Sequence, residues 1–242
     1  MKKNKISGII AIVFVIAVSA VFGPEALDAF DFGGPVELGS GETVGFDVSE
    51  GLPRYEGEPY VEVNDGIPFF DEEDLELGSF EKYSRLDSLG RCGTAFANIS
   101  PELMPTDERQ PIGSVKPTGW HTASYPEVIP ERYLYNRCHL IAWCLAGENA
   151  NRRNLITGTR YMNVEGMLPA EEKVLDYVRD TGNHVLYRVT PVFEGDNLVA
   201  SGVLMEAYSV EDSGEGICAC VYCFNVQPGV WIDYETGESG LE

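Results

Sequence analysis

The stretch that decides the fold is YLYNRCHLIAWCLAGENANRRNLITGTRYMNVEGMLPAEE, which runs from residue 133 to residue 172. Polar, chemically capable side chains are concentrated here, in a chain that is elsewhere apolar or acidic. Asn136, Arg137 and His139 come first, and apolar residues follow His139 directly. This pattern predicts a partly buried strand with His139 within it or at its end, where the ring is held rigidly and still faces a cleft.

The polar positions of this stretch keep a specific spacing. Asn154 and Asn163 lie nine residues apart, and Glu171 follows Asn163 after eight. Upstream of them stands the motif Asn136-Arg137-Cys138-His139. The arrangement resembles the D-R-G-H motif, the two asparagines and the glutamate of the DNA/RNA non-specific endonucleases. The resemblance covers roughly residues 60–235, and residues 148–169 are similar to the secreted and DNA-entry branch of the family in Gram-positive bacteria.

The resemblance implies a fold and an activity. The implied fold is α+β, a central antiparallel β-sheet with flanking helices and a ββα-metal nuclease site. The implied activity is metal-dependent, sequence-nonspecific hydrolysis of DNA, which leaves 5′-phosphate ends, and the sequence does not decide whether RNA is a further substrate. The implied cofactor is one Mg²⁺ ion, for which Mn²⁺ can substitute.

The chemistry of phosphodiester cleavage gives each matched residue a role. His139 is the expected general base, because the unperturbed pKa of histidine suits proton transfer near neutral pH. Arg137, planar and always charged, is expected to clamp the scissile phosphate. Mg²⁺ needs only one or two protein oxygens, and the family match implies that Asn163 supplies one and that Glu171 holds a metal-bound water. Asn154 matches a position that orients the site.

Each of these residues, taken alone, has a structural interpretation. A histidine beside an apolar run is more often a satisfied structural residue, and an asparagine is more often a turn or cap residue than a ligand. Surface arginine–carboxylate pairs usually mean little. The joint spacing of five positions, rather than any single residue, favours the catalytic interpretation.

The motif also departs from the family pattern. Asn136 replaces the aspartate, Cys138 replaces a glycine, and Leu175 stands where the family has an arginine one turn after the glutamate. Arg160 or Arg153 is expected to make the phosphate contact that the missing family arginine would make. Arg91, between two glycines, is either a further phosphate contact or a structural residue.

The charge balance is unusual for a protein that binds a polyanion. The 242-residue chain allows one sizeable domain plus extensions, and its formal net charge is −22. Residues 25–82 alone hold 17 acidic side chains against two basic ones. Five arginines surround the motif, at positions 132, 137, 152, 153 and 160. The sequence therefore predicts a local basic cleft on an acidic body, with modest and salt-sensitive affinity for DNA.

The N-terminus carries an export signal. Three lysines precede an apolar run at residues 6–22, and Val18-Ser19-Ala20 is a passable cleavage site. The run is a signal peptide or an uncleaved membrane anchor, and either places the body outside the cell. No cysteine directly follows the apolar run, which excludes a lipoprotein anchor. The expected organisation is a signal peptide or membrane anchor at residues 1–23, an acidic flexible linker at 24–58, and an endonuclease domain at 59–242. The domain is expected to be extracellular, either secreted or anchored to the outer face of the cell membrane.

Patterns along the domain predict its elements. A first strand from residue 59 ends in a turn at Asn64-Asp65-Gly66, and the acidic run Asp71–Asp74 is expected to start a solvated helix. We expect a turn and a strand in residues 84–99, a loop-rich stretch at 100–131, and a helix from Glu171 that Gly182 caps. Gly166 and Pro169 predict a break before that helix. An antiparallel meander is expected at 184–193, 198–210 and 217–226, followed by a tail that is mostly loop.

The remaining histidines and aromatic residues give weaker signals. His184 begins a predicted strand, so a structural role is expected for it. His121 lies in the loop-rich stretch and is a weak candidate for the site, whereas aromatic packing of Trp120 at the cleft rim is the favoured interpretation.

The six cysteines leave several alternatives open. Buried free thiols are the commoner outcome for such residues, and a disulfide of Cys92 with another cysteine stays open. Cys218 and Cys220 share one strand face and Cys223 points to the other, which argues against a zinc site.

Two rival functions remain beside the nuclease. Cys138 is a rival nucleophile, but its neighbour His139 would face the opposite side of the strand. A second rival is a nuclease fold retained only for DNA binding during uptake. The sequence does not decide whether a protein inhibitor binds the chain.

Overall fold

The computed structural model describes residues 36–38, 42–44, 52–75 and 78–242. The expected signal or anchor at residues 6–22 lies outside this part of the chain, as does most of the expected linker. Within the linker range, β1 (Val36–Leu38) pairs with β2 (Glu42–Val44) in an antiparallel hairpin. No helix among the described residues is both long and apolar enough to cross a membrane.

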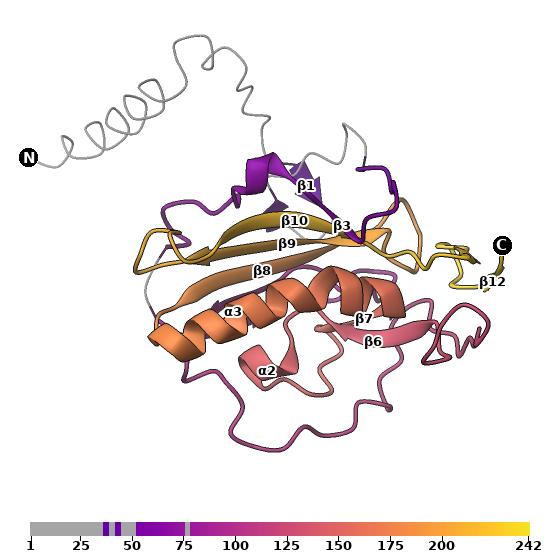
Figure 1. Cartoon of the computed structure of the whole chain (residues 1–242), viewed down its shortest axis with the longest axis horizontal. Coiled ribbons are helices and arrows are strands. Elements are labelled where there is room, and N and C mark those ends of the chain that lie inside the picture. The colour runs from indigo at the N-terminus through magenta and orange to yellow at the C-terminus, as the bar shows by residue number, and fades with distance from the viewer. Residues whose placement is uncertain (1–35, 39–41, 45–51, 76–77) are drawn as a thin grey trace, which may run out of the picture. The chain divides into compact units, whose positions relative to one another are not determined.

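A six-stranded antiparallel sheet forms the centre of the domain (Figure 1). The strand order is β3-β10-β9-β8-β5-β4. The three long strands β8, β9 and β10 are the predicted meander, which is confirmed. The strand bounds are β3 (Tyr60–Glu62), β4 (Phe80–Tyr83), β5 (Ala95–Ile99), β8 (Val185–Val192), β9 (Gly202–Ser209) and β10 (Cys218–Phe224).

One face of this sheet is covered by the helix α3 (Leu168–Thr181), which lies across the long strands in Figure 1. Val174 and Val178 of α3 pack in one apolar cluster with Tyr187 of β8 and Met205 of β9. Each fully buried side chain of this kind contributes about 1.5–3 kcal/mol. All eight residues of β8 are buried, because the opposite sheet face is covered as well. The α+β prediction with a central antiparallel sheet is confirmed.

The predicted break before α3 is wrong. A π-helical turn, η4 (Met162–Met167), runs directly into α3, and the N–H of Leu168 donates to the carbonyl oxygen of Asn163. Pro169 lies at the first turn of α3, where its missing N–H is tolerated. Gly166 is buried, and a Cβ there would lie 3.3 Å from the Cβ of Cys223. It therefore lets the helix approach β10 closely and does not end it. The cap at Gly182, with φ of 73°, is as predicted.

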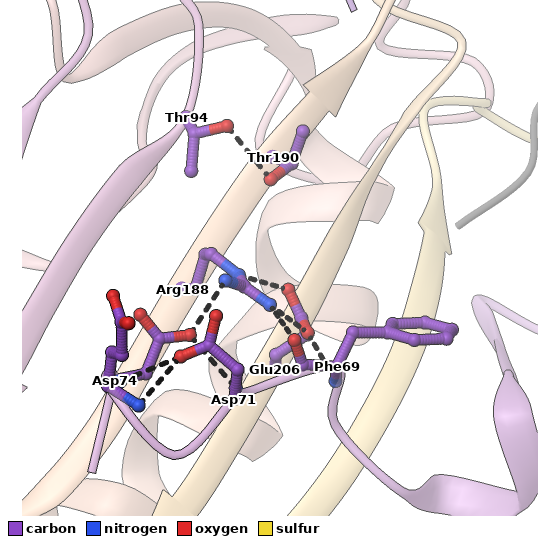
Figure 2. Close-up of polar contacts among 8 residues, drawn as sticks. Phe69, Asp71, Asp74, Thr94, Arg188, Thr190 and Glu206 are labelled. Carbon is purple, nitrogen blue, oxygen red and sulfur yellow. Dashed lines mark hydrogen bonds and ion pairs between the residues drawn. The ribbon is translucent and has the colours of Figure 1, made fainter. Parts of the chain in front are cut away.

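The other sheet face buries a charged cluster around Arg188 of β8 (Figure 2). The guanidinium donates to both carboxylate oxygens of Glu206, at 2.6 and 2.8 Å, and to the carbonyl oxygen of Phe69 at 2.9 Å. Asp74 accepts a longer contact of 3.5 Å from the same group. The Arg188 guanidinium also lies over the ring of Phe70, 4.6 Å from its centre.

This cluster corrects the prediction for the acidic run Asp71–Asp74. The segment forms a turn rather than the start of a helix. Asp71 accepts bonds from the backbone N–H groups of Glu73 and Asp74, which closes the turn. The turn presents Asp74 to Arg188, with which it forms a long-range ion pair.

The C-terminal tail is also more regular than predicted. β11 (Val230–Ile232) and β12 (Ser239–Leu241) form a hairpin. Val230 packs in a second apolar cluster with Leu134 and Tyr135, and the Tyr135 hydroxyl donates to the carbonyl oxygen of Gly237 at 2.9 Å. These tertiary contacts hold a hairpin whose strands are too short to be recognised from the sequence.

Candidate active site

The candidate site is built on a second, two-stranded sheet beside α3 (Figure 1). The strand β6 (Tyr135–His139) pairs with β7 (Leu155–Thr159), and His139 stands opposite Leu155. His139 is the last residue of β6 and is 7% exposed, as the prediction of a partly buried strand required. The short helix α2 (Trp143–Ala146) follows and leads into the connection to β7.

The hydrogen bond of the His139 ring fixes its tautomer. Nε2 lies 2.9 Å from the carbonyl oxygen of Asn149, which can only accept. Nε2 therefore carries the hydrogen in the neutral ring, and Nδ1 is the nitrogen with the lone pair. Burial lowers the pKa of His139 and the positive charge of Arg109 lowers it further, against the raising effects of the backbone carbonyls of Asn149 and Glu148. The neutral, proton-accepting ring is thus favoured near neutral pH.

Asn154 holds the backbone that follows His139. Its side chain is fully buried, and it accepts a bond from the N–H of Ile141 at 2.8 Å and donates to the carbonyl oxygen of Ile141 at 2.9 Å. Its own carbonyl oxygen accepts from the N–H of Leu140. These bonds fix the chain next to His139, which fits a positioning role.

Arg137 is anchored to the long loop before β6. Its Nε donates to the carbonyl oxygen of Val115 at 2.5 Å, and a terminal nitrogen donates to that of Gly113 at 3.2 Å. The guanidinium lies over the ring of Trp120, 4.0 Å from its centre. Trp120 therefore packs on the arginine of the motif. His121, the weak candidate, contacts the carbonyl oxygen of Thr236 instead.

Glu171 is a buried carboxylate in the first turn of α3. It makes no hydrogen bond or ion pair with the described part of the chain, and burial raises its pKa to about 8. Its charge acts on the thiols of Cys138 and Cys144, which places it beside β6 and α2. A buried carboxylate without a partner is costly, and such groups are typical of functional sites.

Arg109 is the cation that the sequence analysis missed. Its positive charge lowers the pKa of both His139 and Glu171, so this exposed side chain acts on both electrostatically. No motif surrounds it, because it belongs to the loop-rich stretch at 100–131. Its place at the site depends on the path of that loop, which no local pattern encodes.

The other predicted arginines either make contacts within the protein or are exposed. Arg160 forms an ion pair with Glu131 at 3.1 Å, and Arg153 is exposed. Arg91 pairs with Asp87 at 2.7 Å and donates to the carbonyl oxygens of residues 195 and 197. Arg91 is thus fully engaged inside the protein, and contact of any of these three with nucleic acid stays a prediction.

Asn163 and Glu171 fit a hard divalent cation. Asn163 lies half-buried in η4, and its side chain has no hydrogen bond to the residues that the structure describes. π-helical turns often occur at functional sites. Within the described ranges, no three His, Cys, Asp or Glu side chains gather into a metal cluster. An amide oxygen, one carboxylate and retained waters are the kind of ligand set that Mg²⁺ accepts.

The cysteine at the motif's glycine position is structural. Cys138 is fully buried and burial raises the pKa of its thiol, so it is no exposed thiolate nucleophile. Its backbone does not adopt positive φ, and glycine is therefore not required there. Gly158 on β7 makes the room, since a Cβ at Gly158 would collide with the Cys138 sulfur. All six cysteines are free, so the disulfide alternative for Cys92 is wrong.

Comparisons with known proteins agree with this geometry. Residues 74–211 match the family model for DNA/RNA non-specific endonucleases. This chain belongs to that family. A search of the curated proteins finds no match.

Solved nuclease structures share the fold of this family member. NucA from Streptococcus agalactiae without metal is 26% identical, with a TM-score of 0.68 over 80% of this chain and 92% of NucA. The magnesium-bound form of NucA is 25% identical, with a TM-score of 0.67 over 77% of this chain and 91% of NucA. The zinc-bound Sda1 nuclease is 26% identical, with a TM-score of 0.63 over 81% of this chain and 99% of Sda1. The predicted family and its ββα-metal fold are thereby confirmed, and the chain is by family a non-specific endonuclease.

Proposed function

We propose that this chain is a metal-dependent nuclease in which His139 is the general base for phosphodiester hydrolysis. The observation that carries the proposal is the bond from His139 Nε2 to the carbonyl oxygen of Asn149, which leaves Nδ1 as the proton acceptor. General bases of this kind contribute about 10²–10⁴-fold to the rate. The proposed substrate is DNA, and the description of the family as DNA/RNA non-specific endonucleases extends the proposal to RNA.

In the proposed reaction, Nδ1 of His139 takes a proton from a water molecule as the water oxygen attacks the phosphorus. The bond from phosphorus to the 3′ oxygen breaks in line, and that oxygen leaves as a hydroxyl after it takes a proton from solvent. The products are a 5′-phosphate end and a 3′-hydroxyl end. Arg137, held by Val115 and Trp120, is positioned to neutralise charge that develops on the phosphate.

The metal ion would be Mg²⁺, with Mn²⁺ as a substitute, held by the amide oxygen of Asn163 and through water by Glu171. When bound, it would stabilise the negative charge that develops on the phosphate and on the leaving oxygen. The magnesium-bound structure of NucA supports this choice, and the zinc-bound structure of Sda1 shows a second ion in a related protein.

Arg109 takes the place of the family arginine that Leu175 replaces. Leu175 packs against the apolar cluster under α3 and carries no charge. Arg109, in the loop, instead lowers the pKa of His139 and Glu171 through its positive charge. It supplies the second positive charge beside the scissile phosphate, while Arg153, Arg160 and Arg91 stay candidates for contacts further along the strand.

The protein is proposed to act outside the cell. The lysines and the apolar run of residues 6–22 support export as a secreted or membrane-anchored enzyme. Detection of the chain in medium or on the outer cell surface, and its loss when residues 6–22 are deleted, tests this part.

The function is tested by digestion of plasmid DNA with the purified protein, in Mg²⁺ and in chelator. We expect cleavage in Mg²⁺ only, and its loss in His139→Ala with an unchanged circular dichroism spectrum. His121→Ala is the matched control and keeps wild-type rates, because His121 contacts only the tail. Wild-type cleavage by His139→Ala would overturn the role of the base. A folded protein that binds DNA without cutting it would instead support the binding-module alternative.

A further inference from the structure

The segment between α2 and β7 connects the general base to the loop that carries Arg109. Asn149 lies half-buried in this segment. Its carbonyl oxygen lies 2.9 Å from Nε2 of His139, and its side-chain Oδ1 accepts the backbone N–H of Gln110 at 2.8 Å. One residue therefore contacts the base with its main-chain oxygen and the loop with its side-chain oxygen.

The bond from Gln110 acts on the backbone of its neighbour Arg109. The N–H of Gln110 belongs to the peptide group that joins the two residues, and a peptide group is planar. The bond to Asn149 therefore fixes the plane in which the chain leaves Arg109. The orientation of the Asn149 amide is consistent with this contact, because its Nδ2 donates to the carbonyl oxygen of Gly147 at 3.4 Å.

This bond holds an exposed part of the loop, residues 106–111, which we call the Arg109 loop. Just before it, Pro105 lies against Gly147, since a Cβ on that glycine would be 3.7 Å from Pro105. Within the described part of the chain, the bond to Asn149 is the one hydrogen bond from the Arg109 loop to another segment. Loss of Oδ1 is therefore expected to release the loop while Pro105 stays in place.

The place of the Arg109 charge depends on this docking. The side chain of Arg109 is exposed and forms no ion pair or hydrogen bond with the residues that the structure describes. Its positive charge nevertheless lowers the pKa of His139 and of Glu171, two groups that the proposed reaction uses. A long side chain without a partner has many rotamers, so a fixed backbone is what limits where its guanidinium can reach.

We propose that Asn149 is a positioning residue that docks the Arg109 loop on the segment that orients His139. The carbonyl oxygen of Asn149 sets the ring of the base, and Oδ1 sets the backbone beside the cation. The base and the cation are thereby held in one arrangement relative to the scissile phosphate. This role rests on the proposed function, and it is effective because small displacements of a reacting or charged group lower the rate strongly.

The first test removes Oδ1 and keeps the carbonyl oxygen that His139 contacts. In Asn149→Ala, we expect kcat/KM on plasmid DNA in Mg²⁺ to fall about tenfold, which corresponds to one hydrogen bond. Because Asn149 acts through Arg109, the double variant of Asn149→Ala with Arg109→Gln should be no slower than Arg109→Gln alone. Losses that multiply in the double variant would show that Asn149 acts independently of Arg109, and would overturn the proposal.

The pH profile of Asn149→Ala separates the roles of the two oxygens. Arg109 lowers the pKa of His139, whereas the bond to the carbonyl oxygen of Asn149 raises it. Release of the Arg109 loop should therefore move the midpoint of kcat/KM to higher pH, as Arg109→Gln does. A shift to lower pH would show that the carbonyl bond to the ring had loosened instead, and would contradict the role of the side chain.

Hydrogen exchange measures the docking itself in the absence of substrate. The backbone amide of Gln110 should exchange severalfold faster in Asn149→Ala than in the wild type. Asn151→Ala is the matched control, because Asn151 is half-buried in the same connection and its Oδ1 accepts the N–H of Arg153 within its own turn. This variant should keep the wild-type exchange at Gln110 and a cleavage rate within about twofold of the wild type.

The outcomes distinguish the docking role from the proposed function. Equal exchange at Gln110 in the wild type and in Asn149→Ala would overturn the docking role and leave the nuclease intact. No cleavage by the wild type in Mg²⁺ would overturn the proposed function and the positioning role with it, although exchange at Gln110 would still show whether the loop is docked.

Discussion

The two sides of the central sheet each bury a carboxylate, and the two carboxylates have opposite surroundings. On the side away from α3, Glu206 is fully buried but receives two bonds from Arg188 and one from the N–H of Phe69 (Figure 2). On the α3 side, Glu171 is 9% exposed and has no such bond among the described residues. A paired buried charge supports the fold, whereas an unpaired one raises the free energy of the folded state unless a ligand compensates it. The comparison therefore separates a structural charge from a functional one.

The largest effect is expected on the structural side. Glu206→Ala removes the main partner of Arg188 and leaves its buried guanidinium only the carbonyl oxygen of Phe69 and the 3.5 Å contact with Asp74, so the free energy of unfolding should fall by about 3 kcal/mol. Urea denaturation measures this loss. The double variant Arg188→Met with Glu206→Leu is the control and should recover most of it, because it leaves no unpaired charge. A loss below about 1 kcal/mol in the free energy of unfolding of Glu206→Ala would contradict the structural role of this buried ion pair.

On the functional side, Glu171→Gln should stabilise the metal-free protein at alkaline pH. The pKa of Glu171 is raised from 4.5 to about 8 in the folded state, so the folded state binds more protons between these values. The stabilisation that protonated Glu171 gives the folded state is fully present below pH 4.5 and is lost as the pH rises through about 8. At pH 9 in chelator, the variant should therefore be more stable by roughly 2 kcal/mol, allowing for relaxation around the charge.

The same substitution should abolish most nuclease activity, since Glu171 is proposed to hold a metal-bound water. Asp176→Asn, at an exposed position of α3, is the matched control for both measurements. A Glu171→Gln variant that is less stable than the wild type at pH 9 would show that the carboxylate has a partner after all.

A smaller effect is expected from Arg109, which acts on both His139 and Glu171. Arg109→Gln should lower kcat/KM by about 10–100-fold, because it removes a positive charge that faces the developing negative charge. Arg54→Gln, at an exposed arginine outside the motif, is the charge control and should change the rate less than about twofold. Equal losses in the two variants would show that Arg109 acts only through the overall charge of the protein.

The smallest expected effect is on the pH dependence of kcat/KM. Burial lowers the pKa of His139 below its usual 6.5, so the general base stays neutral into mildly acidic solution. kcat/KM should therefore rise with pH through a midpoint below 6.5 and level off above it. Arg109→Gln should move this midpoint upward, because Arg109 opposes the protonated ring. A midpoint at or above 6.5 in the wild type would contradict the burial of the ring.

Local patterns in the sequence were sufficient to predict part of the fold and of the candidate site. The alternation and apolar run around His139 predicted its place at the end of a strand, and glycine after a helical pattern predicted the cap at Gly182. The spacing from His139 to Glu171 led to the family that the comparisons confirm. These features depend on neighbours in the sequence.

The remaining features depend on distant partners. The turn at Asp71–Asp74 places Asp74 beside Arg188, 114 positions later, a contact that no local pattern encodes. Arg109 reaches the site through a loop without periodicity, and Gly166 serves a contact with β10 that resembles a helix break in the sequence. In each case, a tertiary contact overrides the local preference that the prediction used.

The central claim is that Nδ1 of His139 takes the proton from the attacking water. Chemical rescue tests it most directly, by digestion of plasmid DNA with folded His139→Gly in Mg²⁺, with and without added imidazole. The account predicts a loss of about 10²–10⁴-fold without imidazole. Part of the rate should return as the concentration of neutral imidazole rises. Full activity of His139→Gly without imidazole would contradict the claim.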